Sequence, residues 1–154
     1  MKELIEKFYT AFQNLDAEKM CACYHDTIEF EDPAFGKLHG DKAKNMWRML
    51  CQNAKDLKIE FSDIIIDGNT ATTHWEAYYT FSKTGRKVHN SIDATFEFKD
   101  NKISKHTDTF NLHKWAKQAM GFKGLLLGGT SFFKNKLNEQ TNILLEKFEA
   151  KHTL

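Results

Sequence analysis

The sequence has little of several features that mark particular classes of protein. It has no run of about 18 apolar residues, which a membrane-spanning helix needs, and no basic and apolar leader follows Met1. Its charge is nearly balanced, with 22 basic and 21 acidic residues. Its three cysteines, Cys21, Cys23 and Cys51, are odd in number and lack the paired spacing of a metal site. We therefore expect a cytoplasmic protein with reduced thiols, and neither a nucleic acid nor a membrane as partner.

The sequence also has no internal repeat, no low-complexity tract and no linker, and its only proline is Pro33. A chain of 154 residues can bury about 70% of the surface that its unfolded form exposes. We therefore expect a single domain over residues 1–154, with residues 121–154 as a helical C-terminal extension.

Apolar residues at helical spacing predict helices at both ends of the chain and one between them. The first runs from about residue 3 to residue 15, and Asp16 is a plausible N-cap for a short second helix. A helix over residues 41–51, which Asp41 could cap, would lie across the sheet. Helices over residues 112–120, ending at Gly121, and over residues 131–151 complete the set. The last helix needs a surface to cover, either the sheet or a second subunit.

Alternating apolar and polar residues predict a curved antiparallel meander. The strands cover residues 27–32, 57–66, 72–81, 88–98 and 102–109, and residues 35–40 are expected to form a loop. A bulge near Ser62 and Asp63 would keep both apolar sets of the second strand facing inward. Helices packed against such a sheet make an α+β fold shaped like a cone.

The predicted hairpin over residues 88–109 carries the first candidate site. Ser104, His106, Asp108 and Phe110 share one face of its second strand, so an imidazole and a carboxylate point the same way. On an apolar wall the pKa of the carboxyl can rise toward neutrality, and the imidazole can relay its proton. The alternative is a structural pair that ties down the end of the strand.

Three segments resemble the SnoaL-like polyketide cyclase group of the nuclear transport factor 2-like superfamily, which also holds ketosteroid isomerases. They are Phe8–Phe12, Ile28–Pro33 and Asp100–Phe110, and the resemblance runs from about Leu4 to Trp115. It implies a cone-shaped curved antiparallel sheet packed against N-terminal helices, with an additional C-terminal helix. This architecture hosts enzymes and non-enzymes alike.

The resemblance also implies roles for two aspartates. Asp108 matches the acid/base aspartate of SnoaL-like cyclases, with His106 as its neighbour on the same face. Asp32, before Pro33, matches the proton-shuttling base of ketosteroid isomerases. The alternative for Asp32 is a turn-forming Asp-Pro pair.

The rest of the isomerase pattern is broken in this sequence. The position of the isomerase tyrosine falls at Phe8, with Tyr9 adjacent, and its second acid falls at Ala94, while Asp93 faces outward by parity. Steroid isomerisation by that set of residues is therefore not expected.

Other chemistries of the superfamily are also disfavoured. Limonene-epoxide-type hydrolases need an arginine between two aspartates, but Arg48 falls on a helix and Arg86 beside a turn. The scattered histidines lack metal-ligand spacing, so we expect no metal, and no cofactor is implied. Several aromatic residues could line a ligand cavity, although such residues more often form the core: Phe8, Tyr9, Trp47, Trp75, Tyr79 and Phe96.

Three functional hypotheses follow. The first is a cofactor-independent isomerase, cyclase or lyase of dehydratase type, in which Asp108, His106 and Asp32 perform general acid/base chemistry on an apolar carbonyl or hydroxyl compound. The second is a non-catalytic binding protein for a lipophilic small molecule. The third is an interaction module that uses the open face of the sheet. We also expect a homodimer through this outer face.

Overall fold

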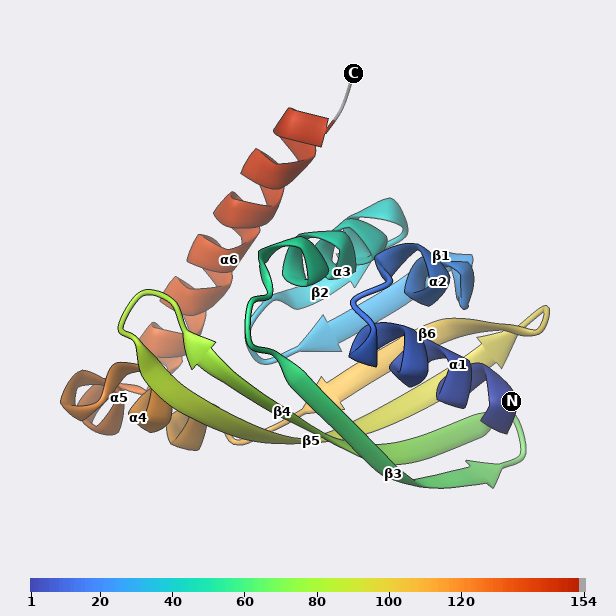
Figure 1. Cartoon of the computed structure of the whole chain (residues 1–154), viewed down its shortest axis with the longest axis horizontal. Helices are drawn as coiled ribbons and strands as arrows, with labels where there is room; N and C mark the ends of the chain where they lie inside the picture. Colours follow the sequence, from blue (N-terminus) through green and yellow to red (C-terminus); the bar gives the residue numbers. More distant parts are fainter. Residues whose placement is uncertain (153–154) are drawn as a thin grey trace.

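The computed structural model describes residues 1–152, which form a curved, unclosed sheet with helices on its inner side and at one end (Figure 1). The six strands are ordered β2-β1-β6-β5-β4-β3, and every neighbouring pair is antiparallel except β1 and β6, which run parallel. The elements in chain order are α1 (Lys2–Gln13), α2 (Ala17–Ala22), β1 (Tyr24–Asp32), β2 (Gly36–His39), α3 (Asp41–Asn53), β3 (Lys58–Asp67), β4 (Thr70–Phe81), β5 (Arg86–Lys99), β6 (Lys102–Thr109), α4 (Leu112–Met120), α5 (Phe122–Leu127) and α6 (Ser131–His152). The predicted α+β class is confirmed.

Side-chain hydrogen bonds cap the N-termini of α2 and α4, and one predicted cap is absent. Asp16 caps α2 and Asn111 caps α4, each by accepting a bond from the amide three residues later. Gly121 ends α4 with a positive φ of 65°, as predicted. The prediction that Asp41 caps α3 was wrong, because the N-cap is Gly40 and no side chain bonds to that helix end.

Strand alternation is confirmed for most of β4 and β5, but Ile66 of β3, which was expected to face inward, is 37% exposed. The bulge in β3 is confirmed, since its pairing with β4 shifts between Ser62 and Ile65 and Asp63 adopts a φ of 56°. The predicted loop over residues 35–40 was wrong, because Gly36–His39 forms β2 and pairs with β1. A strand of four residues is too short for alternation to distinguish it from a loop.

β6 lies in the middle of the sheet, between β1 and β5. Its pairing with β5 shifts so that Ile103 takes an inward position and Ser104 is left in a bulge, where its hydroxyl donates to the carbonyl of Glu97. The predicted common face was therefore wrong for Ser104. His106 and Asp108 do share the inner face, and both are buried.

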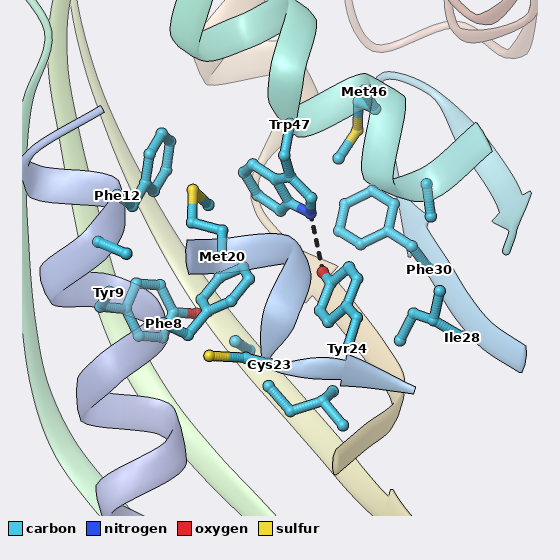
Figure 2. Packing of buried hydrophobic residues seen from close by; sticks show 14 of the residues in the cluster. Phe8, Tyr9, Phe12, Met20, Cys23, Tyr24, Ile28, Phe30, Met46 and Trp47 are labelled. Carbon is cyan, nitrogen blue, oxygen red and sulfur yellow. Dashed lines mark hydrogen bonds between the residues drawn. The ribbon is translucent and has the colours of Figure 1, made fainter. Parts of the chain in front are cut away.

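Helices α1, α2 and α3 cover this inner face. Figure 2 shows Phe8 and Tyr9 of α1 packed near Met20 of α2, and Trp47 of α3 bonded to the hydroxyl of Tyr24. Burying each large apolar side chain contributes about 1.5–3 kcal/mol. The interior of the cone is thus filled by side chains from the helices and from the sheet.

Helix α6 packs against the turn that joins β1 to β2. Leu145 is fully buried in the main core, and α6 also contacts α3. The side chains of Asn138, Thr141 and Asn142 donate hydrogen bonds to the backbone carbonyls of Pro33–Phe35. Within one subunit the last helix therefore covers the open end of the sheet.

Candidate active site

His106 lies at the centre of the aromatic core. Its ring centroid is 4.5 Å from that of Phe96, 5.2 Å from Phe30 and 5.5 Å from Phe8, and it stacks on Trp47 at 6.0 Å. The imidazole has no exposed surface. It can therefore exchange protons only with the groups to which it is hydrogen-bonded.

A directed chain of hydrogen bonds passes through this imidazole. The indole Nε1 of Trp47 lies 2.8 Å from the Tyr24 hydroxyl, which lies 2.7 Å from Nδ1 of His106 (Figure 2 shows the first bond). An indole can only donate, so the Tyr24 oxygen accepts from Trp47. The Tyr24 hydrogen then needs an acceptor, and Nδ1 of His106 is the one in reach. The imidazole hydrogen is therefore on Nε2, facing Asp108 at 2.9 Å.

Asp108 is held through one of its two carboxylate oxygens. Oδ1 accepts hydrogen bonds from Nε2 of His106 and, at 3.2 Å, from the indole Nε1 of Trp75. Among the described residues no donor reaches Oδ2. Asp108 is 4% exposed to solvent, whereas His106 is fully buried. One oxygen thus fixes the orientation of the carboxylate, and the other is available for a further partner.

Asp32 lies beside Asp108 on the neighbouring strand. The parallel register pairs Phe30 with His106 and Glu31 with Thr107, so the next two residues are Asp32 and Asp108. Neighbouring strands are about 4.8 Å apart, and both side chains follow the inward parity of their strands. The sheet therefore brings two carboxyl groups together at the end of β1.

Asp32 also forms a turn, as the structural alternative predicted. Its Oδ1 accepts from the amides of Ala34 at 2.9 Å and Phe35 at 2.6 Å. Although the residue is partly exposed, its carboxyl is enclosed, and this burial, reinforced by the negative charge of Asp108, raises the pKa of Asp32 to about 7. The two aspartates thus differ in hydrogen bonding, Asp108 being anchored by two side chains and Asp32 by backbone amides.

Tyr9 adds an unused polar group to the same region. Its hydroxyl is buried without a hydrogen-bond partner, unlike every other buried side-chain polar atom of the described residues. Burial, followed by the charge of Asp108, raises the pKa of the Tyr9 phenol well above its ordinary value. The hydroxyl is therefore a neutral donor within electrostatic range of Asp108.

The aromatic residues predicted to line a cavity contact one another. Tyr9 packs on Trp75 and Phe96, and Phe8 packs edge-on to Trp47, with centroid distances between 5.5 and 6.3 Å. Two surface hollows found on residues 1–152 lie elsewhere, one over the outer faces of β4, β5 and β6 and one between α2, α3 and the end of α6.

Other predicted groups lie apart from this cluster. Tyr79 accepts a hydrogen bond from the indole of Trp115 in a second, smaller core under α4. Arg48 binds Glu18 on the surface, and Arg86 donates to the carbonyl of Gln118. Within residues 1–152 no three His, Cys, Asp or Glu side chains are grouped as metal ligands.

Sequence reasoning missed Tyr24 and the indole of Trp75 as partners of the pair. Tyr24 begins β1, and the sequence predicts Trp75 as a core or cavity-lining residue without a hydrogen bond to Asp108. Parity predicts that Trp75 faces inward, as Asp108 does, but it does not pair the two side chains. Nothing local could have linked Tyr24 to His106, which is 82 residues away.

Residues 5–106 match the family model described as the SnoaL-like domain. An LEH-like epoxide hydrolase from M. tuberculosis is 23% identical, with a TM-score of 0.62 and coverage of 82% of this chain and 89% of that one. A protein of ketosteroid isomerase-like fold from Catenulispora acidiphila is 10% identical, with a TM-score of 0.67 and coverage of 76% and 92%. A candidate polyketide cyclase from a Silicibacter species is 18% identical, with a TM-score of 0.62 and coverage of 77% and 93%. At these sequence identities the likeness shows that the chain shares their fold, and nothing about its activity. No curated protein matches the chain.

Proposed function

The chain belongs to the SnoaL-like domain family, and we propose that it catalyses proton transfer, without a cofactor, on an apolar carbonyl or hydroxyl compound held between Asp32 and Asp108. The observation that supports the proposal is the parallel pairing of β1 and β6, whose last pair, Glu31 with Thr107, comes one residue before the two aspartates. Paired carboxyl groups in different surroundings suit acid and base roles.

Asp108 is the base in this proposal. Its Oδ1 is fixed by two donors, so Oδ2 is left in a defined orientation to take a proton from the substrate. His106 and Tyr24 position the carboxylate, because their hydrogen bonds fix which imidazole nitrogen faces it. Neither residue needs to touch the substrate.

Asp32 is the acid. With its pKa at about 7, the carboxyl is half protonated at neutral pH and can donate to a substrate oxygen. In an isomerisation, a carbon-bound proton moves to Asp108 while Asp32 protonates the carbonyl oxygen, giving a neutral enol. Asp108 then returns its proton to a different carbon, and the enol hydrogen returns to Asp32, so both groups end as they began. The free hydroxyl of Tyr9 is a second donor for the same oxygen.

Substrate access in this proposal is at the β1–β2 turn. The aromatic rings fill the space behind the two aspartates, so the ligand would displace the side chains of the turn rather than enter an open cavity. Asn138, Thr141 and Asn142 of α6 hold the turn in place through its carbonyls. Loosening these bonds would open the route.

The test follows deuterium from heavy water into the α-carbons of a small apolar ketone such as 2-decalone, measured by mass spectrometry. Asp108→Asn keeps acceptors for Trp75 and His106 but loses the base, so we expect exchange to slow about 100-fold or more. Asp93→Asn is the matched control, since this carboxylate lies on the outer face and is 82% exposed. A folded Asp108→Asn protein, judged by circular dichroism, that exchanges at the wild-type rate would refute the assignment.

In a second proposed function, binding of a lipophilic molecule without turnover, His106 and Asp108 have only a structural role. Both ring nitrogens of His106 already have protein partners, as expected of a structural pair. Native mass spectrometry of freshly purified protein distinguishes the two functions. A retained and chemically unchanged apolar ligand, together with no deuterium exchange, would favour the binding protein.

A further inference from the structure

The end of the molecule formed by α5 and the first turn of α6 exposes large apolar side chains. We call residues 122–136 the α5 tip. Phe122 is 73% exposed, Leu126 is 62% exposed and Phe132 is 65% exposed, and Leu125 and Leu127 are also exposed. Figure 1 shows α5 beside α4 at one end of the molecule, with the start of α6 next to them. Monomeric proteins rarely expose so many large apolar residues together.

The backbone fixes this apolar face outward. A Cβ atom on Gly124 would lie 1.9 Å from the carbonyl oxygen of Ala116, and one on Gly128 would lie 2.5 Å from the Ala116 Cβ. These two glycines therefore let α5 press directly against α4. Phe122, Leu125 and Leu126 are three and four residues apart, so they share one helix face. That face points away from α4, and the described residues leave it open.

The charge of this part of the chain is of one sign. Residues 109–138 contain five lysines and no acidic residue: Lys114, Lys117, Lys123, Lys134 and Lys136. The rest of the chain holds 17 basic against 21 acidic residues, since the whole has 22 and 21, so this segment is +5 and the remainder −4. All five lysines are exposed, and the only ion pair that the described residues form with them is Lys136 with Glu139. The expectation of no membrane partner rested on the net charge of the whole chain. That sum hides the separation between this basic segment and the acidic remainder.

We propose that the α5 tip docks on the surface of an anionic phospholipid bilayer. Exposed aromatic and leucine side chains insert at the boundary between headgroups and acyl chains, and flanking lysines bind the phosphates. A second copy of this chain fits less well, because each tip carries three lysines and no acidic residue, so tip-to-tip contact would bring like charges together. The protein would lie on the membrane, since no helix of the described chain has the length and apolar character to cross it. This docking does not depend on the proposed proton transfer.

The test is sedimentation of the full chain with vesicles, at low salt, of two compositions: equal parts phosphatidylglycerol and phosphatidylcholine, and phosphatidylcholine alone. We expect at least about tenfold tighter binding to the anionic vesicles, weakening as salt is added. Phe122→Ser with Leu126→Ser should weaken it about tenfold or more. The matched control is Ile65→Ser, an equally exposed apolar residue on β3, at 62%.

The charge arm of the test uses Lys123→Glu with Lys134→Glu, which should weaken binding at least about tenfold. Its control is Lys7→Glu with Lys99→Glu, which changes the net charge by the same amount. Lys99 ends β5, whereas Arg86 at the start of that strand bonds to α4 beside the tip.

Three results would overturn the proposal. One is that wild-type protein does not bind anionic vesicles. Another is that the tip variants bind as tightly as wild type, or no more weakly than their controls. The third is that the serine pair leaves vesicle binding unchanged but halves the mass in analytical ultracentrifugation, which would make the tip an interface between copies.

Discussion

Two buried tyrosines on the inner face differ in the hydrogen bonding of their hydroxyl groups, and removing each hydroxyl oxygen tests this difference. Tyr24 both accepts a hydrogen bond from Trp47 and donates one to His106, whereas the hydroxyl of Tyr9 has no partner. Replacing Tyr24 by Phe leaves the Trp47 N–H and Nδ1 of His106 without partners. Replacing Tyr9 by Phe removes a buried polar group that makes no hydrogen bond. The same chemical change should therefore have opposite effects at the two positions.

The expected magnitudes are well separated. An unsatisfied buried polar group costs about 1–3 kcal/mol, so Tyr24→Phe should lower the free energy of unfolding by about 2–4 kcal/mol after some relaxation of the imidazole. Tyr9→Phe should leave it unchanged or raise it by up to about 1 kcal/mol. Because domains of this size unfold with about 5–15 kcal/mol, the first effect is a large fraction of the total.

Urea unfolding followed by fluorescence of the three tryptophans measures both variants. Equal denaturant slopes would show that the comparison concerns the folded state. If Tyr24→Phe is neutral, the hydrogen-bond chain deduced for His106 is wrong. If Tyr9→Phe destabilises the protein as much as Tyr24→Phe, the Tyr9 hydroxyl is not the unbonded group that the structure shows.

Three further predictions follow. Burial raises the pKa of Asp32 from 3.8 to about 7, so between these pH values the folded state binds more protons than the unfolded state, and the free energy of unfolding falls as pH rises. Asp32→Asn should flatten this dependence and stabilise the protein at pH 8 by up to about 4 kcal/mol, measured by urea titration at pH 5 and 8. Asn138→Ala removes hydrogen bonds to the carbonyls of Pro33 and Ala34, so amide hydrogen exchange in the β1–β2 turn, measured by mass spectrometry, should become roughly tenfold faster. Asn135→Ala, on the exposed side of α6, should leave it unchanged, and equal exchange in the two variants would show that Asn138 does not hold the turn. We also expect a homodimer through the outer sheet face, and a monomeric mass in light scattering at micromolar concentration would contradict it.

The sidedness of the site could be predicted from the sequence, because alternation in a strand depends only on neighbouring residues. His106 and Asp108 face inward as parity required. Parity failed two residues earlier, at Ser104, where the pairing between β5 and β6 slips by one position. A bulge is decided by two strands together, so the sequence of one strand does not reveal it.

The partners of the site could not be predicted, because they come from distant parts of the chain. The parallel pairing that sets Asp32 beside Asp108 joins segments about 75 residues apart, and no local pattern chooses that register. Likewise the clamp of α6 on the β1–β2 turn depends on Asn138, Thr141 and Asn142, which read as ordinary polar residues of an exposed helix.

The parallel pair of β1 and β6 also bears on the order of folding. β3, β4, β5 and β6 follow one another through hairpins and can pair as soon as each is made, but β1 must wait for the last strand of the sheet. Closing a loop of this length costs chain entropy before any contact compensates it, and such pairings slow folding. A nascent chain that ends before residue 102 therefore holds β1 with an open edge and Tyr24 with no imidazole to bind, so newly made protein passes through an interval in which that edge can pair with another chain.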